Sequence, residues 1–169
     1  MSRPPAVLGL FWTVLKLLVL ANLLFGVFVV VALIATFIAP GEFVAMLGSP
    51  GASATVIDGL RLLAGIGILS VPLSHLVLTR LIGIVETVRD GDPFVEANAH
   101  RLSTMAWALL GLEALHLGSI LVAVGTSDET GKIDWSFSIT GWLAVLLLFV
   151  LSRVFEEGAR LRADLEGTI

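Results

Sequence analysis

The sequence predicts an all-α integral membrane protein: a single-domain bundle of four transmembrane helices with helical extensions into the cytoplasm and both chain ends in the cytoplasm. Three observations predict this fold. First, 57% of the 169 residues are hydrophobic, 14% are charged and the mean hydropathy is +1.00, whereas about a quarter of a soluble domain is charged. Second, four apolar stretches approach the ~20 residues that a membrane-spanning helix needs. Third, the basic residues gather on one side of these stretches.

The predicted spans follow from apolar length and from helix-ending residues. Pro40 and Gly41 end the first span, because this pair does not continue a helix. Pro72 lies inside the second span, where a membrane helix tolerates proline if neighbouring groups satisfy the freed backbone. Residues 41–58, rich in Gly, Ser and Ala, are expected to form a flexible connector. The predicted spans cover residues 17–38, 60–79, 103–124 and 135–152.

Basic residues set the predicted orientation, since cytoplasmic loops carry an excess of Lys and Arg. Arg61 and Lys132 are the two basic residues on the predicted outer side. The other eight flank the spans on the opposite side: Arg3, Lys16, Arg80, Arg89, Arg101, Arg153, Arg160 and Arg162. This asymmetry predicts that both chain ends and the central loop are cytoplasmic.

Two predicted helices continue past the membrane. After Arg80, apolar residues recur at helical spacing until Gly91 ends the helix. Asp92 and Pro93 are expected to be the N-cap and the first position of the next helix. The last span likewise continues into the tail. At ~1.5 Å per residue, these extensions reach on the order of 15–20 Å beyond the bilayer. Together they form a collar, residues 80–102 and 153–166.

Two segments of the collar carry a family resemblance. Residues 91–102 read GDPFVEANAHRL, and residues 155–169 read FEEGARLRADLEGTI. In combination, these motifs resemble those of a bacterial membrane protein family known as domain of unknown function two-nine-seven-five. The resemblance covers essentially the whole chain and implies four helices in the bacterial cytoplasmic (inner) membrane. The signature that carries it consists of Gly91, Asp92, Pro93, Phe94, Asn98, Arg101, Phe155, Gly158 and Leu161.

The resemblance also implies a regulatory function. Genes of the family often stand beside genes for small helix-turn-helix proteins, which implies a membrane protein that controls a soluble transcription factor. This implication is an association and not the chemistry of a site. Each collar segment has three arginines against four carboxylates, so direct nucleic-acid binding is not expected. An acidic surface suits a basic DNA-binding protein instead.

The signature has two interpretations. In the first, a docking surface for a partner is formed by Phe94, Asn98, Arg101 and Phe155. In the second, the same residues hold the collar together, with Asn98 and Arg101 bonded to the tail at Glu156 or Glu157. The structural role is favoured for the Pro93–Phe94 pair, because proline often occupies the first turn of a helix.

Ionisable residues inside a membrane are costly and mark candidate functional sites. A candidate polar cluster within the predicted spans contains Asn22, His75, Glu113 and His116. It would relay protons or bind a small ligand; in the favoured structural interpretation, the four side chains satisfy one another. Glu113 and His116 have the spacing of half of a carboxylate-bridged di-metal site. Because the chain has one copy, a dimer would have to supply the other half, and no metal, haem or other cofactor is expected.

Two functions remain. The favoured one is a membrane regulator that binds a soluble partner through the collar. The alternative is a small oligomeric transporter, channel or ligand-binding protein around Glu113. It is disfavoured because the sequence has no internal repeats or paired broken helices. No enzyme activity is expected, since the chain has no cysteine and no glycine-rich phosphate loop.

Overall fold

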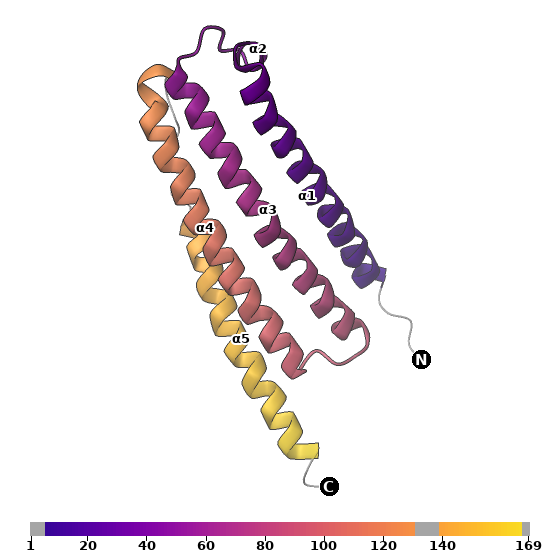
Figure 1. The fold of residues 1–169 in the computed structure, drawn as a ribbon. Coiled ribbons are helices and arrows are strands. Elements are labelled where there is room, and N and C mark those ends of the chain that lie inside the picture. The colour runs from indigo at the N-terminus through magenta and orange to yellow at the C-terminus, as the bar shows by residue number, and fades with distance from the viewer. Residues whose placement is uncertain (1–5, 131–138, 167–169) are drawn as a thin grey trace.

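The computed structural model of the chain describes residues 6–130 and 139–166, and its regular elements there are all helices. Residues 135–138 of the last predicted span lie outside this part. The helices α1, α3, α4 and α5 are long and apolar enough to cross a membrane, which confirms the predicted all-α, four-helix membrane bundle. Figure 1 shows the order of the elements: α1 (Ala6–Ile38), α2 (Pro40–Met46), α3 (Ala54–Arg89), α4 (Glu96–Thr130) and α5 (Ile139–Glu166).

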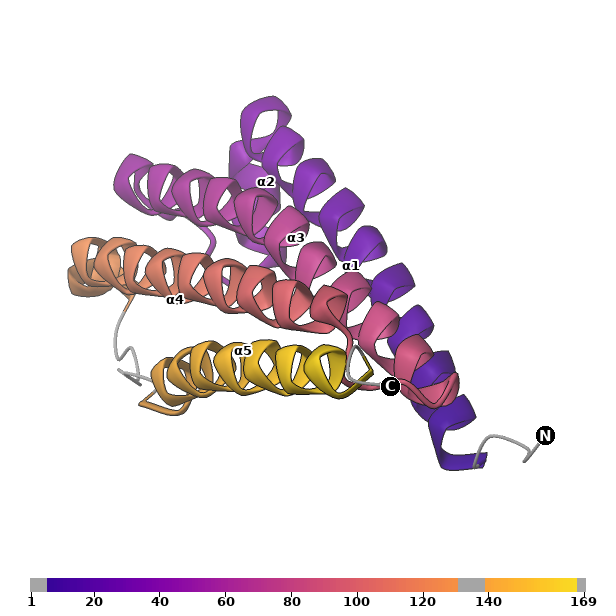
Figure 2. The same ribbon diagram turned by 90° about the horizontal axis from the view of Figure 1, so that it is seen from below.

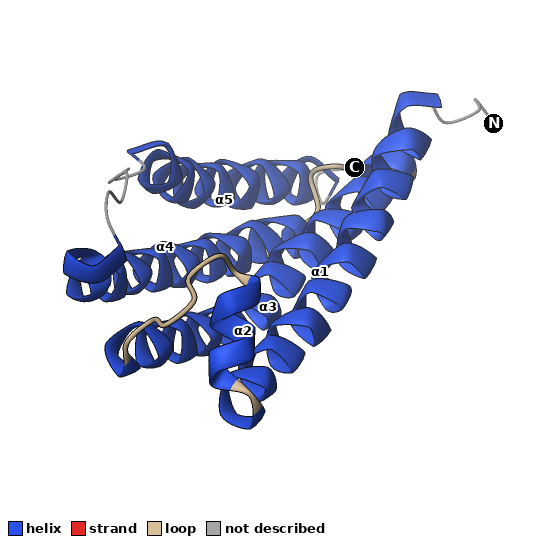
Figure 3. Ribbon diagram, turned by 90° about the horizontal axis from the view of Figure 1, so that it is seen from above, coloured by secondary structure: helices blue, strands red, loops and turns tan. Residues whose placement is uncertain are grey.

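The four long helices pack in a row. α1 packs against α3, α3 against α4 and α4 against α5, while the short α2 packs against α1. Figures 2 and 3, seen from below and from above, show the row as a fan with α1 and α5 at its edges. The inner helices α3 and α4 therefore have two main neighbours each, and the edge helices have one.

The start of α1, the loop between α3 and α4 and the end of α5 lie at one end of the row (Figure 1). This arrangement is what four alternating spans require. α3 and α5 continue as single helices beyond their predicted spans, to Arg89 and Glu166. The helical collar therefore lies at the same end as both chain ends.

Much of the surface of the row is apolar. α1 presents large side chains to the outside around much of its circumference, among them Phe28 and Leu24, which are 67% and 61% exposed. In lipid, such exposure costs nothing, and burial of apolar surface no longer drives helices together. Close packing of backbones must therefore contribute more to helix association than it does in water.

Glycines provide this close packing. At Gly59 on α3, an added β-carbon would lie 2.6 Å from Thr126 Cγ2 on α4. At Gly26 on α1, it would lie 3.1 Å from a methyl group of Val71 on α3. Small residues at these crossings let the helices approach each other closely.

Replacing Gly59 by valine is expected to lower the free energy of unfolding by about 1–3 kcal/mol, the usual cost of overpacking. The clash is with a short β-branched side chain, which has little room to move away. The matched control is Gly65→Val on the same helix, where an added β-carbon meets no atom within 4 Å. The free energy of unfolding of both variants is measured in mixed detergent micelles. Equal losses of stability in the two variants would contradict the packing argument.

The structure corrects two predictions between the spans. α4 begins at Glu96, so the prediction that Asp92 and Pro93 start this helix is wrong. The Pro93 carbonyl accepts the Asn98 side-chain amide at 2.8 Å, which holds Pro93 in the loop instead of a first helical turn. The predicted flexible connector, residues 41–58, is largely helical: it overlaps α2, which begins at Pro40 and packs against α1, and the start of α3 at Ala54.

Candidate functional site

The collar is organised around the end of α3. Gly91 has φ +85°, a left-handed conformation that glycine adopts readily. Its N–H donates to the Val88 carbonyl at 3.2 Å, and the Asp92 N–H donates to the Thr87 carbonyl at 3.0 Å. These two bonds form a Schellman motif. Gly91 therefore ends α3, as the sequence predicts, and turns the chain towards α4.

Asn98 is the centre of the collar and is fully buried, with 0% of its surface exposed. Its amide Nδ2 donates to Thr87 Oγ1 at 2.7 Å and to the Pro93 carbonyl at 2.8 Å. Its amide oxygen accepts from Arg101 Nη1 at 2.7 Å. A single side chain in the first turn of α4 thus connects α3, the loop and the next turn of α4.

Arg101 extends this network back onto α3. Its Nη1 also donates to the Gly83 carbonyl at 3.1 Å. A β-carbon at position 83 would lie 2.9 Å from Arg101 Nε, so glycine makes room for the guanidinium. The Arg101 guanidinium therefore bonds to groups within the collar.

A second set of contacts fixes the tail. The rings of Phe94 and Phe155 lie 5.2 Å apart between centroids. Gly158 leaves room for Phe94, since a β-carbon there would be 3.1 Å from its ring. Arg162 of α5 forms an ion pair with Asp92 of the loop. The two halves of the signature, far apart in the sequence, therefore meet in the structure.

The prediction that Asn98 and Arg101 bond to the tail at Glu156 or Glu157 is wrong. Both bond within the hairpin of α3, loop and α4, because Asn98 faces α3 and is enclosed there. The loop residues Phe94 and Asp92 contact the tail instead. Leu161 is the signature residue that stays outside this network, with 56% of its surface exposed.

A groove runs along α4 and α5 beside this network, and it comprises two cavities of about 520 and 400 Å³ that share Glu96 and Glu156. The larger cavity lies over the loop and the tail. The smaller one runs towards Trp107 and Phe149, whose rings meet edge to face at 5.3 Å. Residues lining the larger cavity include Asp92, Phe94, Val95, Ala159, Arg160 and Ala163.

Charges line the groove unevenly. Arg162 is paired with Asp92, and Arg153 Nη1 lies 2.9 Å from Glu156 Oε2. Glu96 has no ion pair with any residue in the described part of the chain. The groove thus combines apolar walls with paired charges, the unpaired carboxylate of Glu96 and the exposed guanidinium of Arg160, which also has no ion pair among the described residues.

The candidate polar cluster is divided between two interfaces. Asn22 of α1 donates to the Val71 carbonyl of α3 at 3.1 Å. His75 is partly buried one turn further along α3, where it lines an apolar cavity of about 480 Å³ with Leu23 and Pro72. Its Nδ1 is buried without a hydrogen-bond partner.

Glu113 lies on the other side of the row. Its carboxyl packs against Gly141 of α5, where an added β-carbon would be 1.8 Å from Glu113 Oε1. Glu113 Oε2 is buried without a hydrogen-bond partner, and His116 is exposed. The prediction that the four polar residues satisfy one another is therefore wrong. Among the described residues, no three His, Asp or Glu side chains gather where they could hold a metal ion.

The comparison with known families agrees with the signature. A family model described as "Protein of unknown function (DUF2975)" matches residues 52–169. The chain belongs to this family. No curated protein and no solved structure matches it. The matched region of this DUF2975 protein includes the whole collar, the groove and the Glu113–Gly141 contact, whereas α1 and α2 lie before it.

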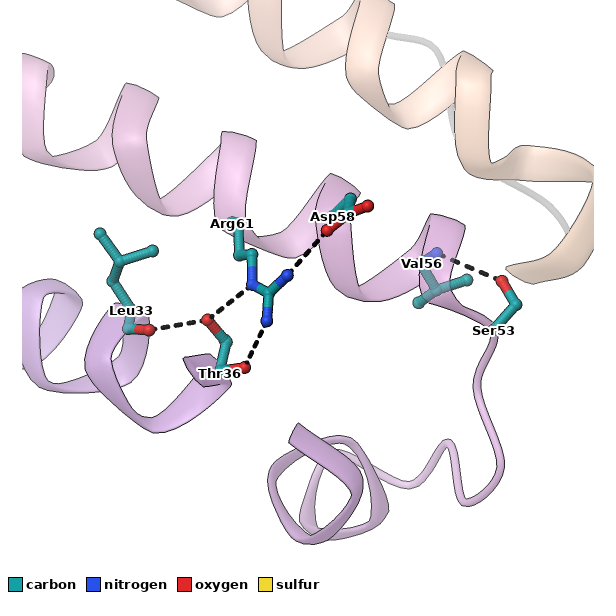
Figure 4. Close-up of polar contacts among 6 residues, drawn as sticks. All are labelled: Leu33, Thr36, Ser53, Val56, Asp58 and Arg61. Carbon is teal, nitrogen blue, oxygen red and sulfur yellow. Dashed lines mark hydrogen bonds and ion pairs between the residues drawn. The ribbon is translucent and has the colours of Figure 1, made fainter. Parts of the chain in front are cut away.

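Sequence reasoning missed one polar cluster of the DUF2975 protein, at the last turn of α1 (Figure 4). Arg61 of α3 donates to the Thr36 carbonyl at 2.8 Å and to its hydroxyl at 3.4 Å. The same guanidinium pairs with Asp58 at 2.8 Å and lies over the Phe37 ring. A cation at the last turn of α1 satisfies a carbonyl that has no helical partner and suits the helix dipole. The i, i+3 spacing of Asp58 and Arg61 is the signal that could have indicated it.

Proposed function

We propose that this protein is a membrane-anchored regulator in a bacterial cytoplasmic membrane that binds a small helix-turn-helix transcription factor on its collar. The groove between α4 and α5 carries the proposal, because its larger cavity lies in the collar, beyond the predicted spans, while the smaller one reaches into the spans at Trp107 and Phe149. Two signature residues, Asp92 and Phe94, line the larger cavity. The proposal assigns the chain no catalytic activity.

The shape of the groove supports a protein ligand. Apolar wall is supplied by Phe94, Val95, Ala159 and Ala163, and the two cavities follow one another along the antiparallel helices α4 and α5 (Figure 1). A groove that combines apolar wall with charged residues can receive an amphipathic helix, whose apolar face packs in the groove and whose polar residues meet the charges. Small side chains on α5 leave room for the large apolar residues of such a helix.

The charge of the collar supports a basic partner, since each of its two segments has three arginines against four carboxylates. The Arg101 guanidinium is withdrawn into the Asn98 network, and Arg153 and Arg162 are each paired with a carboxylate. Glu96 remains unpaired in the described part of the chain and lines both cavities, whereas the unpaired Arg160 lines the larger one alone. Charge complementarity favours positively charged partners at such a surface and speeds their association.

The continuity of α5 supports regulation from the membrane. One helix, Ile139–Glu166, holds the Glu113 contact near its start and a wall of the groove near its end. Its one main neighbour is α4. A shift of α5 along α4 within the membrane would therefore change the width of the groove.

A second candidate function is a small oligomeric transporter or ligand-binding protein that uses Glu113 and His75. The unpartnered polar atoms of these two residues favour it. The separation of the two residues on different interfaces weakens it, because no hydrogen bond connects them among the described residues.

A photo-crosslinking amino acid at Ala163 tests the regulator. In living cells we expect an adduct with a small basic DNA-binding protein, identified by mass spectrometry. Ala159→Trp, which fills the groove, should abolish the adduct, and the purified partner should lose at least tenfold in affinity, an effect of about 1.4 kcal/mol.

Leu165→Trp is the matched control. Leu165 is 70% exposed on the same helix, and it lies about 200° around the helix axis from Ala163. This variant should leave both the adduct and the affinity unchanged. Adducts with copies of this chain alone, or equal effects of the two tryptophans, would contradict the proposal.

A further inference from the structure

A separate cluster at the inner end of α1 surrounds Trp12. The indole Nε1 donates to Glu86 Oε1 of α3 at 3.2 Å. Two cations approach the same ring: Lys16 Nζ lies 3.6 Å from the ring centroid, and the Arg89 guanidinium carbon lies 5.8 Å from it. The cluster therefore brings one cation from α1 and one from α3 to a single aromatic platform.

The two cations are not neutralised by ion pairs. Arg61, Arg153 and Arg162 each have a carboxylate partner. Lys16 and Arg89 have none among the described residues, and both side chains are exposed. Glu86 accepts the hydrogen bond from the Trp12 N–H, and it is the one carboxylate among the described residues that is bonded to this ring. The cluster thus carries two positive charges against one negative charge.

Trp12 and Lys16 lie at the level of the lipid headgroups. Arg89 lies ten positions, about 15 Å, past the predicted span that ends at Thr79, and its guanidinium approaches the Trp12 ring from beyond that layer. Lys16 directly precedes the predicted span that starts at Leu17, and Trp12 lies five positions before Leu17. At ~1.5 Å per residue, the indole is about 7 Å outside the hydrocarbon. The headgroup layer is about 5–8 Å thick on each side of the membrane. Tryptophan is enriched in this layer.

We propose that Lys16 and Arg89 bind the phosphate of an anionic phospholipid from the cytoplasmic leaflet, with Trp12 as the platform between them. An ammonium and a guanidinium both donate charge-assisted hydrogen bonds to phosphate oxygens. The negative Glu86 leaves the cluster one net positive charge, which matches the single charge of a phosphodiester. A lipid bound at this site would hold the inner end of α1, an edge helix, against both α3 and the bilayer.

Native mass spectrometry of the full-length protein in detergent tests the proposal. The protein is titrated with phosphatidylglycerol or with phosphatidylcholine. We expect preferential retention of phosphatidylglycerol. Each lost cation should weaken this binding about fivefold, so Lys16→Gln combined with Arg89→Gln should weaken it about thirtyfold.

Arg80→Gln is the matched control, because Arg80 is also exposed and lies on the same helix nine positions from Arg89, half a turn round. It should leave the affinity for phosphatidylglycerol unchanged. The charge-preserving pair Lys16→Arg and Arg89→Lys should retain most of the binding, which separates a charge effect from misfolding. An equal loss in Arg80→Gln, or an unchanged affinity in the Lys16/Arg89 double variant, would overturn the assignment.

Inorganic phosphate distinguishes the source of the ligand. At constant ionic strength, millimolar phosphate should neither displace phosphatidylglycerol nor raise the unfolding temperature of the lipid-free protein. Displacement together with such stabilisation would assign the site to a soluble phosphate compound and overturn the lipid assignment.

Discussion

Replacing Asn98 by leucine is expected to lower the free energy of unfolding by about 1–3 kcal/mol, the cost of leaving buried polar partners without a hydrogen bond. Asn98 is the fully buried acceptor for Arg101 Nη1, and its amide also satisfies Thr87 and the Pro93 carbonyl. Leucine has a similar volume but satisfies none of the three. Unfolding in mixed detergent micelles measures the loss.

Asn22→Leu is the matched control for this variant. Asn22 is also an amide on a long helix, but it makes one hydrogen bond, to the Val71 carbonyl. A single interhelical bond in a membrane contributes about 0.6 kcal/mol. If the two variants lost equal stability, the energetic weight assigned to the Asn98 network would be wrong.

Loss of the Asn98 hydrogen bonds should also change the shape of the groove. Pro93 precedes Phe94, and Phe94 forms part of the groove wall and contacts Phe155 of the tail. When the Pro93 carbonyl loses its partner, the loop is freed to move away from α5. At temperatures where Asn98→Leu remains folded, we therefore expect weaker crosslinking from position 163.

The membrane fold was predictable because it depends on quantities that a sequence states directly. Apolar length located the spans, and the unequal distribution of arginine and lysine predicted an orientation in which both ends lie on one side. Gly91 was also predictable, since few residues other than glycine adopt a left-handed conformation readily. Each of these inferences uses local information.

The partners of the polar residues were not predictable, because they depend on which neighbour each helix face meets. In a closed bundle, inward faces of α3 and α4 would share one centre, and His75 and Glu113 would meet there. In a row, each inner helix has two faces with different neighbours. Glu113 faces α5 and Asn22 reaches α3, so similar depth in the membrane does not bring them together.

The same reason explains the incorrect start of α4. Asp92 followed by Pro93 has the local pattern of a helix beginning. The tertiary contact from Asn98 to the Pro93 carbonyl delays the helix until Glu96. A side chain five positions further along the chain decides the boundary, and single-residue preferences carry no information about that contact.

Replacing Glu113 by methionine is expected to raise the free energy of unfolding by about 1–3 kcal/mol, the cost that an unsatisfied buried polar group imposes. Glu113 Oε2 is buried without a partner, and the carboxyl packs on Gly141 of α5. Methionine keeps the length of the side chain and removes both polar oxygens. The sign is thus opposite to that expected for Asn98→Leu, although both substitutions remove a buried polar group.

Glu113→Gln is the control, because it keeps the shape and leaves a polar group in the same place. It should change stability by less than Glu113→Met. A loss of stability in both variants would mean that the carboxyl has a partner in the membrane, and the transporter or ligand-binding function would then gain support. A gain in Glu113→Met with unchanged crosslinking at position 163 would place the binding function in the collar alone. A gain with altered crosslinking would identify Glu113 as the membrane end of a connection to the groove, carried by α4, which contains Glu113, and by α5, which packs against it, because both helices line the groove.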